Sequence, residues 1–168
     1  MTVTDLQKQE FRRTVGLFAT GVAVLSCVDP DIDCADVGYV VHGATVNSFT
    51  SVSIHPPTVM VSLMAGRAHQ FITAGGHFGA SVLEAGQQGC SDYFAGKQYV
   101  DPPAFTVRDR VPTLVECHAW FECEVIQRFE IHYHTVFVAR VLSCGDNGGS
   151  PLLFHGSRYH SPDLAARA

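Results

Sequence analysis

Residues 43–57 (GATVNSFTSVSIHPP) bring hydroxyl and amide side chains into a part of the chain that is otherwise rich in Val, Ile and Phe. Serine and threonine disfavour helix interiors because their hydroxyls compete with the backbone for hydrogen bonds. In a strand or turn, the same hydroxyls and exposed backbone N–H groups can hold a polar ligand. Pro56 and Pro57 end the segment and favour an extended chain over residues 58–63. On composition alone, a Thr- and Ser-rich strand and turn without a ligand is the simpler interpretation.

A second candidate site lies at His132 and His134. Two imidazoles two residues apart share one face of a strand and could both reach a metal ion, as in cupins. A cupin would also need a glycine six residues before His132, where Ile126 stands, and a glutamate further on, where Phe137 stands. We therefore expect no metal site, and a strand-edge histidine with satisfied hydrogen bonds is the simpler alternative.

Several common catalytic and nucleotide-binding motifs are absent from the sequence. There is no G-x-S-x-G elbow, no P-loop and no G-x-G-x-x-G after a predicted strand. The chain therefore does not bind a dinucleotide in a Rossmann fold, and any NAD(P)H has to bind in another way.

Composition narrows the class of protein. The 168 residues suit a single domain, 46% are hydrophobic, and the formal net charge of −5 argues against a nucleic-acid binder. We expect no membrane span, and the polar start followed by Arg12 and Arg13 is unlike a signal peptide. The six cysteines are scattered without a C-x-x-C pair, so free thiols in a reducing cytoplasm are expected.

The hydrophobic pattern predicts a mainly β protein with a few short helices. Thr4 is placed to cap an amphipathic helix over residues 6–18, and residues 29–36 and 145–149 carry loop and hairpin signals. Residues 96–110 are expected to form a surface excursion. Further short helical stretches are expected over 69–74 and 87–94, and strands over 22–28, 37–46, 58–63, 78–83, 114–127, 134–143 and 152–159. Short strands separated by turns favour a barrel or a sandwich.

Residues 43–57 resemble the flavin-binding signature of the short-chain flavin reductases, the reductase partners of two-component flavin monooxygenases. The resemblance continues in order through residues 18–25, 78–83, 119–125 and 151–159. It implies one domain over 1–168 (core about 11–160) with the Greek-key split β-barrel fold of FMN-binding proteins. It also implies a homodimer that reduces FMN or FAD with NADH or NADPH and supplies a separate oxygenase component.

The resemblance also implies roles for particular residues. Thr45, Val46, Asn47 and Ser48 would hold the flavin ring, and His134 would contact the nicotinamide. The ribityl chain and the phosphate would be held by Ser51, Ser62 and Arg67. The remaining residues expected to line the flavin cavity are Thr20, Gly21, Leu63 and Phe78.

The sequence departs from the family pattern at three places. Ala68 stands where many members carry Ser or Thr beside the arginine, and Ser81 replaces a common Asn. His132 and Tyr133 replace the Gly and Asp of a Gly-Asp-His motif. Two alternatives follow: a flavoprotein that keeps its flavin and acts directly on an organic substrate, or a flavin-binding partner subunit without activity.

Overall fold

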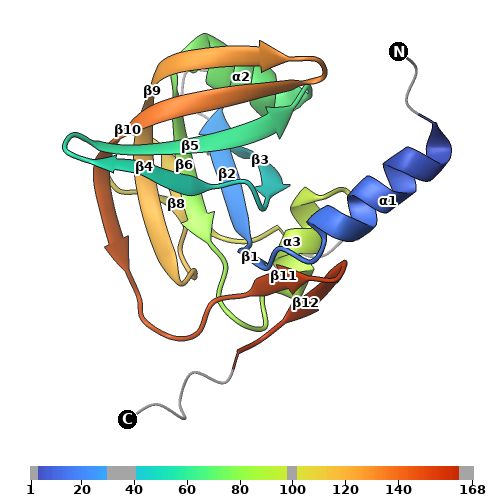
Figure 1. Ribbon diagram of the computed structural model, residues 1–168. Coiled ribbons are helices and arrows are strands. Elements are labelled where there is room, and N and C mark those ends of the chain that lie inside the picture. Colours follow the sequence, from blue (N-terminus) through green and yellow to red (C-terminus); the bar gives the residue numbers. More distant parts are fainter. Residues whose placement is uncertain (1–3, 30–40, 98–101, 163–168) are drawn as a thin grey trace.

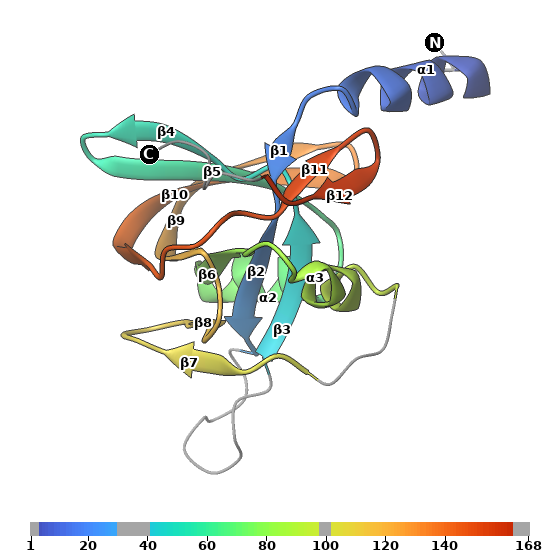
Figure 2. The same cartoon turned by 90° about the horizontal axis from the view of Figure 1, so that it is seen from below.

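The computed structural model describes residues 4–29, 41–97 and 102–162 (Figures 1 and 2). The helices in these ranges are α1 (Asp5–Val15), α2 (Arg67–Gly75) and α3 (Gln88–Phe94). The strands are β1 (Thr20–Gly21), β2 (Ala23–Val28), β3 (Val41–Val46), β4 (Thr50–Ile54), β5 (Pro57–Met64), β6 (His77–Val82), β7 (Phe105–Val107), β8 (Pro112–Leu114), β9 (Ala119–Ile131), β10 (His134–Asp146), β11 (Leu153–His155) and β12 (Arg158–His160). No helix in the described ranges is long and apolar enough to cross a membrane.

The main sheet has seven antiparallel strands in the order β3-β2-β6-β9-β10-β5-β4. Its two edge strands, β3 and β4, are consecutive in the chain and joined only by residues 47–49. A link of that length spans roughly 10–15 Å at most, so the sheet has to curl until its edges meet. No ladder joins β3 to β4, so the barrel stays open along this line (Figure 1). The predicted split β-barrel is confirmed.

The barrel interior is filled by apolar side chains from the inward face of each strand. Leu25, Val61, Phe78 and Phe137 are fully buried there, and Ile72 of α2 closes one end. Burying a side chain of this size contributes roughly 1.5–3 kcal/mol. A second cluster beneath β8 and β11 is built from Val24, Leu83, Leu114, Leu152 and their neighbours.

The short strand β8 is held flat against the outside of the barrel. The Ser26 hydroxyl donates a hydrogen bond to the carbonyl of Pro112, and Ser81 Oγ accepts one from the Leu114 N–H at 2.9 Å. Gly79 lies beneath Pro112, where a Cβ atom would meet the Pro112 carbonyl oxygen at 2.0 Å. Glycine at this position therefore lets two backbones approach more closely than any side chain allows.

The structure confirms the predicted N-terminal helix and its cap, but the helix ends at Val15, three residues before the predicted end. Thr4 accepts a hydrogen bond from the Gln7 N–H at 3.3 Å, and the Gln7 side chain accepts one from the Thr4 N–H, which forms a capping box. The strands predicted over 22–28, 58–63 and 78–83 also form, within two residues at each end.

Three predicted elements were wrong in detail. The strand expected over 114–127 is two strands, because residues 115–118 leave β8 and enter a separate strand, β9. Residues 145–149 do not form a hairpin, since β10 and β11 belong to different sheets. Residues 152–159 fold back on themselves, and β11 pairs with β12 across Gly156 and Ser157. The predicted loop at 29–36 and the start of the strand predicted at 37–46 fall mainly outside the described residues.

Candidate functional site

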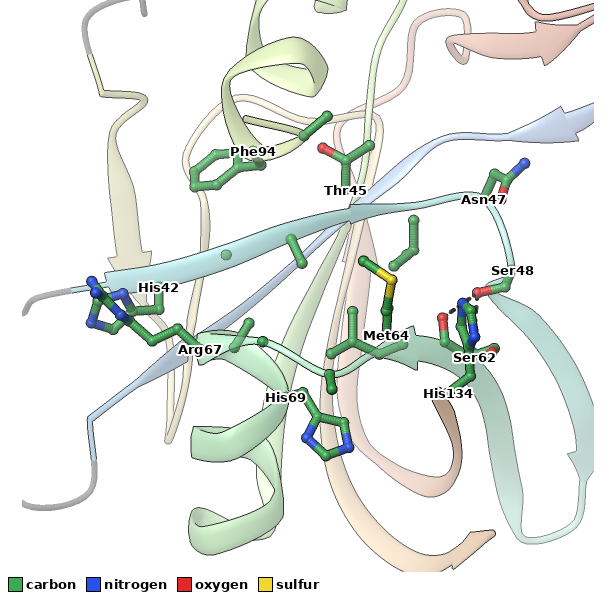
Figure 3. A pocket seen from close by; sticks show the side chains of 18 residues that line it. His42, Thr45, Asn47, Ser48, Ser62, Met64, Arg67, His69, Phe94 and His134 are labelled. Carbon is green, nitrogen blue, oxygen red and sulfur yellow. Dashed lines mark hydrogen bonds between the residues drawn. The ribbon is translucent and has the colours of Figure 1, made fainter. Parts of the chain in front are cut away.

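A cavity of about 560 Å³ opens where the barrel is split (Figure 3). One wall is the free edge of β3, which pairs with β2 on its other side only. The opposite wall is the end of β5 together with the first turn of α2, and α3 and the start of β10 complete the lining. An unpaired strand edge exposes backbone N–H and C=O groups, so this cavity offers backbone hydrogen bonds to a ligand.

Ser48 joins the two sides of the split. β4 pairs with β5 only as far as Met60, so the last residues of β5 lack a neighbour on that edge. The Ser48 hydroxyl replaces this neighbour: it donates to the Ser62 carbonyl at 2.8 Å and accepts from the Ser62 N–H at 3.0 Å. The adjacent Asn47 side chain is exposed and has no hydrogen bond to a described residue. The turn therefore fixes the backbone while leaving an amide free beside the cavity.

The wall above β3 is set by close packing of α3. Thr45 donates its hydroxyl hydrogen to the Ser91 carbonyl at 2.6 Å. Gly43 lies so close to Phe94 that a Cβ atom would stand 2.6 Å from the Phe94 ring. The Thr45 side chain is thus engaged by α3, and the Phe94 ring forms part of the cavity wall (Figure 3).

One end of the cavity has a positive character. Arg67 starts α2 and forms no ion pair with a described residue, and the helix has no side-chain N-cap at Gly66. His42 lies beside Arg67 and packs on Phe71, with ring centroids 4.8 Å apart. Burial, and then the Arg67 guanidinium, lower the pKa of His42, while Asp29 acts in the opposite direction. A helix N-terminus with an unpaired arginine favours an anionic group.

The other end of the cavity is formed by His134, which begins β10 and pairs with Met64. His132 lies in the preceding turn with a positive φ of 54° and does not line the cavity. The Tyr133 carbonyl accepts a hydrogen bond from the Ala65 N–H at 3.2 Å, which ties the turn to the loop before α2. No three His, Cys, Asp or Glu side chains of the described ranges are grouped so that they could share a metal ion.

The residues of the cavity suit a flat ligand with polar edges and a phosphate. Asn47 comes from the turn between β3 and β4, and Ser62, Arg67 and His134 come from β5, α2 and β10. None of these four side chains is hydrogen-bonded to another described residue. Much of the remaining lining is small, with Gly43, Ala44, Ala65, Gly66 and Ala68. Small-molecule sites have volumes of roughly 300–1,000 Å³ and a few well-placed polar groups on an otherwise apolar lining.

Comparison with known proteins identifies the family. The family model for the flavin reductase like domain matches residues 15–163. The chain belongs to this family. It is 48% identical over 165 residues to the NADH-dependent flavin reductase StyB of Pseudomonas fluorescens, covering 95% of this chain and 93% of that protein.

Solved structures agree with this assignment. The chain superposes on the styrene monooxygenase flavin reductase SMOB of Pseudomonas putida S12 with a TM-score of 0.82 and 50% identity, covering 92% of this chain and 98% of the other. It also superposes on the NADH:FAD oxidoreductase SgcE6 of Streptomyces globisporus, solved with NAD and FAD fragments, with a TM-score of 0.83 and 29% identity over 99% of each chain.

Most of the site residues predicted from the sequence meet in this one cavity. Eight of them line it: Thr45, Val46, Asn47, Ser48, Ser62, Leu63, Arg67 and His134. The other four lie elsewhere. Phe78 is fully buried in the barrel core, and Ser51 is exposed on β4. Thr20 and Gly21 pair with Phe154 and Leu153 in the small sheet.

The lining residues to which the sequence analysis gave no role include His42, Met64 and Phe94. His42 directly precedes the segment 43–57, and Met64 directly follows the predicted strand 58–63, so extending each segment by one residue would have included them. Phe94 had no local signal, because it reaches the cavity only through the packing of α3 on Gly43.

The departures from the family pattern have different structural consequences. Ser81 is buried and holds β8 through the Leu114 N–H, so it does not reach the cavity. Ala68 lines the cavity and offers no side-chain hydrogen bond. His132 occupies a left-handed backbone conformation that favours glycine. Because His132 does not line the cavity, its replacement of glycine affects the turn and leaves the cavity lining unchanged.

Proposed function

We propose that this flavin reductase oxidises NADH and reduces a flavin that is exchanged with solution. The observation that carries the proposal is the convergence of Asn47, Ser62, Arg67 and His134 on one cavity, with side chains not engaged by the rest of the described protein. The related proteins are NADH-dependent flavin reductases and include reductase components of monooxygenases.

The residues of the cavity have distinct tasks in this proposal. A bound flavin supplies the redox chemistry. The free edge of β3 at Thr45 and Val46, with Asn47 and Ser48, holds the polar edge of the ring. Ser62 contacts the ribityl chain, and Arg67 forms forked, charge-assisted hydrogen bonds with the phosphate. His134 orients the nicotinamide. Hydride transfer depends mainly on positioning, so no side-chain acid or base is required.

Steady-state NADH oxidation with added free flavin tests this function. A reductase turns over many equivalents of added FAD or FMN, with one NADH oxidised for each flavin reduced. A flavoprotein that keeps its flavin would elute from a column with coloured cofactor and respond little to added flavin. A non-catalytic flavin-binding partner would bind flavin and oxidise no NADH. Either of the last two results would contradict the proposal.

His134→Ala is expected to raise the KM for NADH by about tenfold and to leave flavin affinity nearly intact. The imidazole in this proposal contacts nicotinamide in the ground state and the transition state alike, so kcat should change little. His132→Ala is the matched control, because this residue lies outside the cavity lining. Stopped-flow and steady-state kinetics measure both. If the two variants behave alike, or if only His132→Ala loses NADH oxidation, the assignment of His134 is wrong.

We further propose that the flavin reductase is a homodimer. Helix α1 projects from the barrel (Figures 1 and 2) and buries none of its residues. Leu6, Phe11 and Val15 are 78%, 69% and 52% exposed, and Phe18 beyond the helix is 74% exposed. Apolar patches of this kind on a small protein mark interaction sites, and a second copy of the chain would cover them.

Sedimentation velocity tests the dimer. We expect the mass of two chains, with Phe11→Lys shifting the protein toward monomer because it places a charge in the apolar interface. Glu10→Lys is a control on the same helix, since it changes charge at an exposed polar position. A stable monomeric parent that still binds flavin tightly would contradict the homodimer.

We also propose that the protein is cytoplasmic and that its partner is a separate oxygenase component. Cys27, Cys90, Cys117, Cys123 and Cys144 are free thiols, which fits the reducing cytoplasm where NADH is available. Reduced flavin would leave the open cavity and serve a separate oxygenase component. In support, related proteins are named as the reductase component of a 4-nitrophenol monooxygenase and the flavin reductase component of a two-component tryptophan halogenase.

A further inference from the structure

A smaller cavity of about 190 Å³ lies against the flavin site and shares Thr45, Val46, Asn47 and Ala95 with it. We call this cavity the annex. Three of the shared residues belong to the segment that is proposed to hold the flavin ring. None of the residues that line the annex alone has a task in the proposed function. These residues are three apolar or aromatic side chains and one lysine: Val22, Phe154, Tyr159 and Lys97.

Lys97 brings a positive charge to the annex. Its ammonium lies 3.4 Å from the Asp92 carboxylate and 5.8 Å from the centroid of the Tyr159 ring, and both contacts favour this position of the cation. Lys97 lines the annex, whereas Asp92 lines neither cavity. The ion pair therefore presents its cationic end to the annex.

Hydrogen bonds connect the two groups that hold Lys97 to the segment proposed to hold the ring. The Tyr159 hydroxyl donates to Asp92 at 3.2 Å, so Ser91 is the donor in the 2.9 Å hydrogen bond between the Ser91 and Tyr159 hydroxyls. The Ser91 carbonyl accepts from the Thr45 hydroxyl at 2.6 Å. These contacts join β12, α3 and β3. A charge held in this way needs little reorganisation when an opposite charge develops nearby.

The two cavities carry their positive charges in different places. Arg67 and Lys97 are the only lysine or arginine side chains in the described lining of the two cavities, and no described carboxylate lines either. Arg67 lies beside His42 at one end of the flavin site, and Asn47 lies at the other end (Figure 3). Because Asn47 also lines the annex, Lys97 lies on the side of the flavin ring and Arg67 on the side of the phosphate.

Hydride transfer from NADH places a negative charge on the flavin ring. The hydride carries two electrons and one proton to N5, NADH leaves as NAD⁺, and the reduced flavin is an anion whose charge is shared by N1 and the C2 carbonyl. We propose that Lys97 stabilises this anion, which raises the affinity for reduced flavin relative to oxidised flavin and favours hydride transfer. The inference rests on the proposed function, because it takes the ring to lie at residues 45–47.

The test is the ratio of the dissociation constants of oxidised and reduced FAD. Anaerobic titration against a reference dye gives this ratio as the change in reduction potential that binding causes. Lys97→Met is expected to weaken binding of reduced FAD by about five- to tenfold, a size reasonable for one partly exposed charge, and binding of oxidised FAD by less than about twofold. The single-turnover rate constant of hydride transfer should fall as well. Lys97→Arg keeps the charge and should retain both values.

Lys8→Met is the matched control. Lys8 is also partly exposed and paired with an aspartate, Asp5, at 3.1 Å, but it lines neither cavity. The Lys97 side chain is 60% exposed, so Lys97→Met should fold, and thermal unfolding checks this.

Three results would overturn the inference and leave the proposed function standing. They are an unchanged ratio in Lys97→Met, equal losses of affinity for oxidised and reduced FAD, and the same loss in Lys97→Arg as in Lys97→Met. The last two would show that Lys97 acts through its shape or through binding of both redox states alike. A parent protein that reduces neither FAD nor FMN with NADH would overturn the proposed function itself.

Discussion

Arg67→Ala is expected to weaken FMN and FAD binding by about ten- to hundredfold while changing riboflavin binding by less than about twofold. Hydrogen bonds to charged groups contribute about 1.5–3 kcal/mol, which corresponds to that range of affinity. Arg67 opens α2 at the positive end of the cavity and has no ion pair with a described residue that would compete for it. Riboflavin lacks the phosphate, so it reports on the ring site alone.

Fluorescence titration with the three flavins measures the effect, and Arg128→Ala on the exposed part of β9 controls for the loss of one positive charge. The pKa of His42 provides a second measurement, which requires no flavin. Because Arg67 lowers the pKa of His42, removal of Arg67 should raise that pKa in the flavin-free protein, as followed by NMR titration. Equal loss of riboflavin and FMN would mean that the substitution disrupts the start of α2, and the phosphate assignment would fail.

Gly79→Ala is expected to lower the free energy of unfolding by about 3 kcal/mol, at the upper end of the usual cost of overpacking. An added Cβ would stand 2.0 Å from the Pro112 carbonyl oxygen and 2.7 Å from Ser26 Oγ. Strand β8 would have to move away, which would also strain the Ser26 hydrogen bond to Pro112. Because the stability of a domain is about 5–15 kcal/mol, this is a large fraction of the total.

Thermal unfolding is expected to show the change as a fall in Tm of about 6–12 °C for a protein of this size. Gly89→Ala is the matched control: it lies within α3, no atom lies within 4 Å of its added Cβ, and alanine favours a helix over glycine. The control should therefore melt at the parent temperature or slightly above it. A Tm for Gly79→Ala within about 2 °C of the parent would show that β8 shifts freely and that the close contact carries little stability.

The buried carboxylate of Glu122 is hydrogen-bonded by residues that are distant from it in the sequence. Its carboxylate accepts hydrogen bonds from the Asp109 N–H at 3.1 Å and from the Ser143 hydroxyl at 2.7 Å. Glu122 pairs with Gly79 across β6 and β9. A buried carboxylate is stable only with such partners, and nothing in the pattern around Glu122 in the sequence indicated them.

Features that depend on neighbours in the chain were predictable from the sequence. The capping box at Thr4 involves residues three apart, and the cavity lining from Thr45 to Ser48 is one continuous piece of backbone. Any fold that exposes the end of β3 places these four residues together, so the sequence could group them on one cavity wall before the fold was known.

Features that depend on strand order, on register or on helix packing were settled only by the tertiary structure. Phe78 faces the core and not the cavity because of its register in β6, and a shift of one residue would reverse every side chain of the strand. Phe94 reaches the cavity because Gly43 allows α3 to pack against β3. The cavity itself exists because β3 and β4, consecutive in the chain, lie at opposite edges of a curled sheet, where no ladder closes the gap between them.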